Sequence, residues 1–312
     1  MAGVEIGVEF GAHLPLIDFD RPHGLADLSA YARAAAGLGF SYLCANDHLA
    51  FRRPWLDGPT VLAAVAGAAG SMTLATTVAL PVLRGPVALA KALATLDVLS
   101  GGRLVAGVGP GSSAADYAAA GLDMAERWRR FDEAVPALRS LLHAGAPAVG
   151  GEFYTTTGVA IEPRPVQRPG PPIWVASWGS PAGLRRVARL GDGWLASAYN
   201  TTPERFGAAL AALAAAGGPA EAALATTWLH VSDDRAATER VLAEVLAPAL
   251  GRPPAALAEL PLPIGSAEVC AERLAAYVAA GARRIFLWPL GDELVQLERF
   301  QARVAPLLAD RG

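Results

Sequence analysis

The sequence predicts an α/β protein with a (β/α)8 TIM barrel, and three observations support this fold class. Eight short hydrophobic segments alternate along the chain with segments in which apolar residues recur at helical spacing. Such alternation implies parallel strands joined by crossover helices. Eight units within 312 residues also suit a barrel with insertions. An open doubly wound sheet is the alternative, but no strand–GxGxxG–helix unit opens the chain.

Short runs rich in apolar and β-branched residues, bounded by glycine, proline or polar residues, mark the predicted strands. The segment 40–45 is the clearest example, because its hydrophobic run leads directly into Asn46, Asp47 and His48. The first strand starts at Val4 and ends near His13. The eight predicted strands cover residues 4–10, 40–45, 73–80, 104–108, 173–176, 194–198, 222–231 and 284–288.

The segments between these strands have the apolar spacing of helices. Pro86 suits the first turn of a helix, where no N–H group is needed. Pro136 lies inside a predicted helix and should kink it or mark its real start. The predicted helices cover residues 25–35, 59–69, 86–99, 128–142, 181–190, 234–247 and 266–280, with others starting at 203 and 292.

Two insertions interrupt the alternation. Residues 112–125, after the fourth strand, are small and polar, and we expect an irregular excursion there. Residues 150–171, before the fifth strand, are rich in glycine, threonine and proline and suggest a short hairpin. Residues 253–263 suggest a proline-rich loop. The whole chain, residues 1–312, is predicted to form one barrel domain.

Composition excludes several functions and suggests a cytoplasmic protein. The net charge is −3 and no basic run occurs, so nucleic acid is not an expected partner. No uninterrupted apolar run of about 18 residues occurs, so we expect no membrane span. Cys44 and Cys270 show no pairing pattern and are predicted to be free thiols in a reducing compartment. No signal peptide is evident.

In such a barrel the active site lies at the carboxyl ends of the strands. Few carboxylates occur there and no tight His/Asp/Glu cluster is evident, so a metal-dependent hydrolase is a weak alternative and no metal site is predicted. Aromatic residues near these ends suit a flat aromatic ligand, although they could simply cap the barrel mouth. They are Trp55, Trp178, Tyr199 and Trp288.

Two segments carry more specific chemistry. In 178–183, Gly179 permits close backbone approach, Ser180 can cap a helix and Pro181 suits its first turn. Free N–H groups and the helix dipole would bind an anion there, whereas the alternative is an ordinary helix cap. His48 can transfer a proton, and a nearby carboxylate, that of Asp47, can orient it. The alternative is a rim histidine with a structural hydrogen bond.

Several ordered motifs resemble those of the bacterial luciferase-like flavin-dependent oxidoreductases. The resemblance covers residues 4–200 well and the remainder only in general layout. The tetrad Asn46–Leu49 resembles the second-strand end of members that use a deazaflavin coenzyme. The other matching motifs are residues 96–103, 107–111, 126–133, 178–181 and 191–194.

The resemblance implies a flavin or deazaflavin lying across the mouth of the barrel, with either coenzyme F420 or FMN as the cofactor. It implies that backbone N–H groups around 179–181 hold the cofactor phosphate and that His48 acts near the reactive ring atom. Thr77–Val78 matches a segment where relatives often have a cis peptide bond. Cofactor-binding candidates are therefore Thr77, Val78, Gly107, Gly109, Gly111, Trp178, Gly179, Ser180 and Pro181. Substrate-lining candidates are His13, Trp55, Tyr199 and Trp288.

The chain departs from the sugar-phosphate dehydrogenase branch of this family. Where that branch has an acidic proton donor after its Gly-x-Gly loop, this chain has Ser112, and Lys91 is its only lysine. Glucose 6-phosphate is therefore a doubtful substrate. The resemblance implies hydride transfer to, or oxygenation of, a small organic substrate by a homodimer. The alternative is a non-catalytic flavin-binding barrel.

Overall fold

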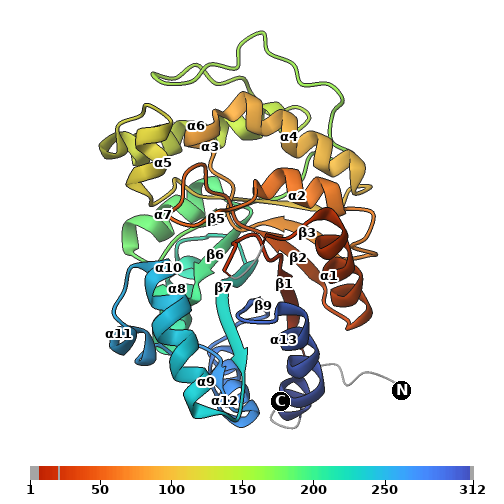
Figure 1. Cartoon of the computed structure of the whole chain (residues 1–312). Helices are drawn as coiled ribbons and strands as arrows, with labels where there is room; N and C mark the ends of the chain where they lie inside the picture. Colours follow the sequence, from red (N-terminus) through yellow and green to blue (C-terminus); the bar gives the residue numbers. More distant parts are fainter. Residues whose placement is uncertain (1–6, 20–21, 310–312) are drawn as a thin grey trace.

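The computed structural model describes residues 7–19 and 22–309, and its strands form one parallel sheet closed into a barrel (Figure 1). Neighbouring strands follow the order β6-β5-β4-β3-β2-β1-β9-β7, and the pairing of β6 with β7 closes the ring. The barrel strands are β1 Glu9–His13, β2 Tyr42–Ala45, β3 Thr73–Thr76, β4 Leu104–Val108, β5 Ile173–Ala176, β6 Gly193–Ser197, β7 Ala222–Val231 and β9 Arg284–Pro289. The predicted (β/α)8 barrel is confirmed.

Helices surround the barrel and follow the strands in the predicted alternation. The longer helices are α1 Leu25–Gly37, α2 Gly58–Val65, α4 Pro86–Leu99, α6 Arg127–Leu142, α7 Pro181–Leu190, α8 Pro203–Ala215 and α12 Ala267–Ala279. The shorter ones are α3 Pro81–Arg84, α5 Ala114–Ala119, α9 Arg235–Arg240, α10 Ala247–Leu250, α11 Pro254–Ala258, α13 Glu293–Arg299 and α14 Ala305–Ala309. None of the helices in the described ranges is long and apolar enough to cross a membrane.

The core has two layers, as the alternation of side chains along strands requires. One cluster fills the inside of the barrel and includes Tyr42, Val105, Trp174 and Phe286, while a larger cluster packs the helices against its outer face. The inner layer is tight: a Cβ atom at Gly11 would lie 2.6 Å from the ring of Phe286. Side chains therefore fill the barrel below its mouth.

Several predicted boundaries are wrong. The third strand ends at Thr76 rather than residue 80, since beyond it only an isolated bridge from Ala79 to Val108 continues the pairing before α3 begins at Pro81. The predicted loop 253–263 contains α11, and an additional two-residue strand, β8 Ile264–Gly265, pairs with β7. The first strand begins at Glu9, and the predicted positions 4–6 lie outside the described residues.

The insertions also differ from expectation. The excursion 112–125 is not irregular, because it contains α5 and a 3-10 turn at Met124–Glu126. Helix α6 runs from Arg127 without a break through Pro136, so this proline does not mark the helix start. In 150–171 the hairpin is reduced to one antiparallel bridge between Gly150 and Thr155.

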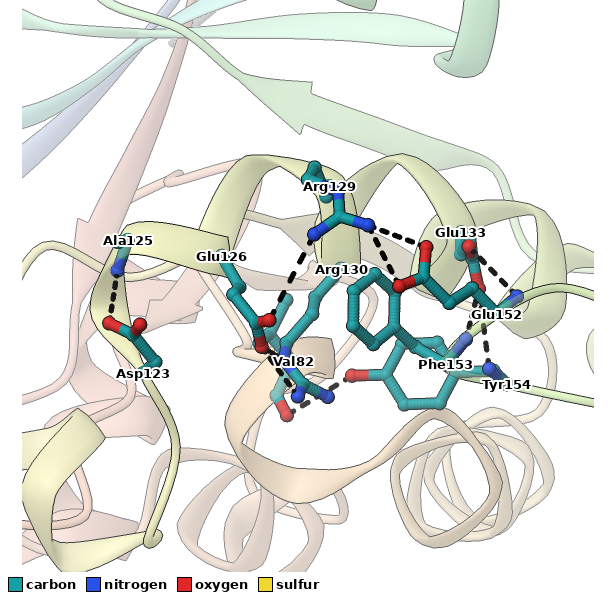
Figure 2. A network of polar contacts seen from close by, with 10 residues as sticks. All are labelled: Val82, Asp123, Ala125, Glu126, Arg129, Arg130, Glu133, Glu152, Phe153 and Tyr154. Atoms are coloured by element: carbon teal, nitrogen blue, oxygen red, sulfur yellow. Dashed lines mark hydrogen bonds and ion pairs between the residues drawn. The ribbon is translucent and has the colours of Figure 1, made fainter.

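The segment between α6 and β5 forms a long loop beyond α4 and α6, drawn in light green in Figure 1. The carboxylate of Glu133 accepts hydrogen bonds from the backbone N–H groups of residues 152–154, at 3.1, 2.8 and 3.3 Å (Figure 2). Arg129 forms an ion pair with Glu152 at 2.6 Å. Residues of the 126–133 motif thus fasten this insertion to α6.

Candidate active site

His48 lies just beyond the carboxyl end of β2, and its partner comes from the insertion after β4. Its Nδ1 atom lies 2.7 Å from Oδ2 of Asp116, in α5. The other carboxylate oxygen of Asp116 accepts the backbone N–H groups of Leu49 at 3.0 Å and Ala50 at 2.6 Å. The Asp116 side chain is fully buried, so these three donors provide its hydrogen bonds in place of water.

The charge of Asp116 fixes the tautomer of His48. Burial by itself raises the pKa of Asp116, but hydrogen bonds from His48, Ala50 and Leu49 outweigh it and leave the pKa below its usual value. An ionised carboxylate only accepts hydrogen bonds, so Nδ1 of His48 carries the shared proton. The Nε2 atom of His48 is then the one available for proton transfer.

The expectation that Asp47 orients His48 is wrong. Asp47 is buried and binds Arg84, which donates from Nε at 2.6 Å and from a terminal nitrogen at 2.5 Å. Arg84 also contacts Asp57, the N-cap residue of α2. Asp47 therefore faces Arg84, whereas the next residue, His48, faces Asp116. A catalytic role for Asp47 stays a prediction.

The first turn of α7 has the geometry of an anion site. Ser180 is the N-cap residue, and its hydroxyl accepts the N–H of Gly183 at 3.2 Å, while Pro181 occupies the first helical position. Gly179 has a φ of 84°, which favours glycine. Ala182 follows in the first turn, where the helix itself supplies no acceptor for a backbone N–H group and the helix dipole is positive. The neighbouring Trp178 is 60% exposed.

Contacts within the protein restrain the backbone around Gly179–Pro181. The N–H of Gly179 donates to Ser177 Oγ at 3.1 Å. A Cβ atom at Gly183 would lie only 2.2 Å from the same oxygen. The absence of a side chain at Gly183 therefore lets the first turn of α7 sit directly on the end of β5.

The β3–β4 side of the mouth contains the predicted cis peptide bond between Thr77 and Val78. Thr77 Oγ1 donates to Asn46 Oδ1 at 3.0 Å, which joins the ends of β3 and β2. A Cβ atom at Gly107 would lie 2.0 Å from the carbonyl oxygen of Thr76, and one at Gly109 would lie 2.7 Å from Val78. Both positions thus need glycine for contacts within the protein.

Gly111 has a different requirement, because its φ of 82° favours glycine. Its loop is fixed by Tyr117 of α5, whose hydroxyl donates to the carbonyl oxygen of Pro110 at 2.5 Å. Close approach of Gly107, Gly109 and Gly111 to a cofactor is a separate matter and stays a prediction.

Aromatic rings fill the mouth beside His48. The ring of Trp55 lies 4.5 Å from that of His48 and 5.7 Å from that of Trp288, measured between centroids. His13 stacks on Trp288 at 4.6 Å, and Trp228 stacks on Trp288 at 4.3 Å. Three of the four residues expected to line the substrate, His13, Trp55 and Trp288, are therefore brought together.

The fourth expected residue, Tyr199, has other neighbours. It lies in the 3-10 turn Ala198–Asn200 after β6, where the guanidinium of Arg252 lies 5.1 Å from its ring centroid. Arg252 also donates to the carbonyl oxygen of Tyr199 at 2.7 Å and to Asn200 Oδ1 at 2.6 Å. Contact of Tyr199 with a substrate stays a prediction.

The sequence reading missed Asp116 and Trp228. A signal for Asp116 existed, because Ser113 followed three residues later by an acid is a helix-start pattern, and Ser113 does cap α5. Trp228 lies in β7 after an irregularity in the pairing between Leu224 and Thr227. That shift changes which side chains face inward, and simple alternation along the strand does not reveal it.

Comparison with known proteins shows which proteins this chain resembles. The chain is 33% identical over 223 residues to an F420-dependent hydroxymycolic acid dehydrogenase of Mycobacterium tuberculosis, covering 67% of this chain and 60% of that protein. The fold matches the monooxygenase RslO1 from Streptomyces bottropensis with a TM-score of 0.80 at 23% identity, over 96% of this chain and 99% of that one. It matches an F420-dependent secondary alcohol dehydrogenase with a TM-score of 0.81 at 18% identity, with the same coverage.

The two structural matches show the fold, and the sequence match spans less than two thirds of its relative. A family model described as luciferase-like monooxygenase matches residues 11–284. That range contains the His48–Asp116 pair, the first turn of α7 and the barrel strands except the first two residues of β1 and all of β9 after Arg284. The chain therefore belongs to the luciferase-like monooxygenase family.

Proposed function

We propose that this protein is an oxidoreductase that uses a reduced deazaflavin, coenzyme F420, or FMN to transfer hydride to, or oxygenate, a small organic substrate. The observation that carries the proposal is the hydrogen bond between His48 and the buried Asp116, because it prepares an imidazole for proton transfer at the barrel mouth. The relative named as an F420-dependent dehydrogenase supports the deazaflavin.

The residues at the mouth fit such a cofactor. The first turn of α7 offers an outward N–H group and the positive end of the helix dipole, which would hold the cofactor phosphate around Gly179–Pro181, beside Trp178. The cis bond at Thr77–Val78 and the loop containing Gly109 and Gly111 would lie against the ring. Phosphate and ring would thus be held by different strand ends.

When bound, the cofactor supplies the hydride or activates oxygen. The chain itself positions the substrate and moves a proton. Asp116 holds Nδ1 of His48, so that Nε2 can give a proton to the substrate or take one from it. The ring of Trp55 lies against this imidazole and would shield it from water on that side, which would strengthen its electrostatic interactions.

A titration of the apo-protein with each cofactor tests the proposal. We expect micromolar affinity for coenzyme F420 and weak or no affinity for FMN, measured by the change in cofactor fluorescence. Tight binding of FMN alone would identify the flavin branch instead. Binding of neither would reject the proposal.

Turnover decides between an enzyme and the alternative, a non-catalytic flavin-binding barrel. Binding without turnover of any alcohol, ketone or aldehyde, in either redox state of the cofactor, would support the alternative. The His48–Asp116 pair argues for catalysis, since a storage protein has no need of an oriented imidazole. We also propose a homodimer in the cytoplasm, which sedimentation velocity and cell fractionation would test.

A further inference from the structure

The loop that carries His48 has its two ends in contact. Residues 46–58 leave the end of β2 and return at the start of α2. The backbone at Gly58 packs on the carbonyl oxygen of Asn46, since a Cβ atom there would lie only 2.1 Å from that oxygen. A surface loop whose ends meet is an Ω-loop, and we call its two ends, residues 46–47 and 57–58, the neck. The position of His48, next to the neck, depends on how the neck is held.

One guanidinium joins both sides of the neck. Arg84, the last residue of α3, donates to Asp47 from Nε at 2.6 Å and from Nη2 at 2.5 Å, and the same Nη2 atom donates to Asp57. Asp57 is the N-cap residue of α2 and accepts the N–H of Thr60 at 2.9 Å. Arg84 therefore ties the end of the loop beside His48 to an end that α2 already fixes.

The closed neck depends on this one positive charge. Two carboxylates that share a single nitrogen atom lie close enough to repel each other when that cation is removed. Within residues 7–19 and 22–309, no other cation pairs with Asp47 or Asp57. A guanidinium suits this position, because its planar fork can bond one carboxylate twice and still reach a second. Loss of Arg84 would therefore widen the neck.

A separate element holds the next residues of the loop. Asp116 of α5 binds the ring of His48 and the backbone N–H groups of Leu49 and Ala50. Helix α5 belongs to the insertion after β4, whereas Arg84 follows β3. The backbone is thus held at Asp47 from one side and at residues 48–50 from the other. A side chain supported by two independent shells keeps one orientation, and here that side chain is the imidazole of His48.

We propose that Arg84 is a positioning residue for the proton transfer by His48, acting through Asp47 and the neck of the loop. With the neck closed, Nδ1 of His48 stays 2.7 Å from Oδ2 of Asp116. With the neck open, the loop that carries His48 would shift relative to α5, and Asp116 would no longer enforce one tautomer. The inference rests on the proposed function, because it names a residue that the proposed reaction needs.

Arg84→Met tests this role first in the apo-protein, through the imidazole itself. The protein is labelled with 15N in its five histidines, and the ring signals of His48 are assigned by their loss in His48→Gln. At a pH where His48 is neutral, we expect the Nδ1–H tautomer in the wild type and a mixture of both tautomers in Arg84→Met. Unchanged His48 signals in Arg84→Met would overturn the inference.

Turnover provides the second readout. We expect kcat of Arg84→Met to fall by about tenfold or more, because a small misplacement of a catalytic group can cost about a hundredfold. The dissociation constant of the cofactor should change little. Arg84→Lys should regain part of the lost kcat, since an ammonium group still offsets both carboxylates. No regain in Arg84→Lys would contradict a role for the charge of Arg84.

Arg284→Met is the matched control for stability. Arg284 also binds two carboxylates, Glu9 at 2.7 Å and Glu221, and its side chain is 21% exposed, against 20% for Arg84. It lies at the start of β9, at the end of the barrel away from the mouth. Its loss should lower Tm but leave the His48 signals and kcat as in the wild type. Equal effects of Arg284→Met and Arg84→Met on kcat would overturn the inference.

A double variant separates position from stability within the site. Asp47→Asn combined with Arg84→Met removes the buried charge together with its partner, so stability should largely return. The neck still lacks its clamp, so kcat and the tautomer of His48 should stay as in Arg84→Met. Recovery of kcat in step with stability would show that Arg84 is merely structural. If Arg84→Met does not fold, Arg84→Gln takes its place, with the same expected and contrary results.

The outcomes distinguish this inference from the proposed function. If no cofactor binds, the proposed function fails, whereas the His48 signals of the apo-protein still decide whether Arg84 positions the imidazole. If the cofactor binds and turns over while Arg84→Met leaves the His48 tautomer and kcat unchanged, the positioning role alone fails.

Discussion

Nδ1 of His48 and Oδ2 of Asp116 lie 2.7 Å apart, although 68 residues separate them in the chain. One belongs to the segment after β2 and the other to the insertion after β4, so the insertion completes the site. The same carboxylate also accepts two backbone N–H groups, from Leu49 and Ala50. Asp116 therefore fixes both the imidazole and the chain that carries it.

Asp116→Asn should lower kcat by about a hundredfold, the lower range of general acid–base contributions, because an amide does not enforce the Nδ1–H tautomer. The dissociation constant of the cofactor should change little. The pH profile of kcat/KM should move as well, which a loss of packing alone does not predict. Asp123→Asn in the same insertion is the control, since it caps only the 3-10 turn. A kcat equal to that of the control would contradict the role of Asp116.

The location of the site was predictable from sequence, but its internal pairing was not. Strand ends carrying polar residues were enough to place His48 at the mouth, and Ser180 with Pro181 correctly predicted the start of α7. Asp47 is adjacent to His48 in sequence, yet the partner of His48 is Asp116, because Asp47 is held by Arg84 instead. Pairing across 68 residues depends on how the insertion folds back.

Arg84→Met should destabilise the protein by about 3–5 kcal/mol, since it leaves the carboxylate of Asp47 buried without its charge partner. Asp47→Asn combined with Arg84→Met should recover much of this loss, because the only carboxylate then left without Arg84, that of Asp57, is exposed to water. Urea denaturation of these two variants and the wild type measures the difference. Arg235→Ala, which removes an exposed pair with Glu239, is the control and should change stability little. Equal losses in the single and double variants would argue against a buried ion pair.

Gly183→Ala should weaken cofactor binding at least tenfold. The added Cβ atom would lie 2.2 Å from Ser177 Oγ and would push the first turn of α7 away from β5. Ser177→Gly introduced together with Gly183→Ala removes the clash and should restore part of the affinity. Fluorescence titration with the cofactor gives both values. Ala188→Gly, later in the same helix, controls for helix propensity. A similar loss of cofactor affinity in that variant would contradict a specific role for the first turn of α7.

Glu133→Gln should release the insertion from α6 without unfolding the barrel. The carboxylate accepts three backbone N–H groups in residues 152–154, and a neutral amide oxygen accepts them less strongly. Hydrogen exchange should therefore speed up at these amides and stay unchanged in β1 to β4. Glu162→Gln, whose pair with Arg164 is exposed, is the control. Uniformly faster exchange would show a global effect instead.

The order of strands and helices was more predictable from sequence than the residues at which each of them begins and ends. Apolar periodicity identified all eight barrel strands, because parallel strands are buried on both faces and read as hydrophobic runs. It failed where helices are short and rich in small residues, as in α5 and α11, since alanine, glycine and serine give little contrast between the two faces. The helix over residues 128–142 was predicted in spite of Pro136, and it forms because helix packing can outweigh a local helix breaker.

His13 should make the protein less stable as the pH falls from 6.5. The pKa of His13 falls from 6.5 in the unfolded chain to about 3 in the folded one. Between these pH values the unfolded state binds a proton at His13 and the folded state does not. Stability is complete above pH 6.5 and is lost as the pH falls towards 3. At pH 5 the loss should be about 2 kcal/mol, from 1.36 kcal/mol for each unit of difference. Urea denaturation at pH 7 and pH 5 measures it, and His13→Phe should be less sensitive by that amount. An equal loss in wild type and variant would mean that the imidazole is protonated in the folded protein.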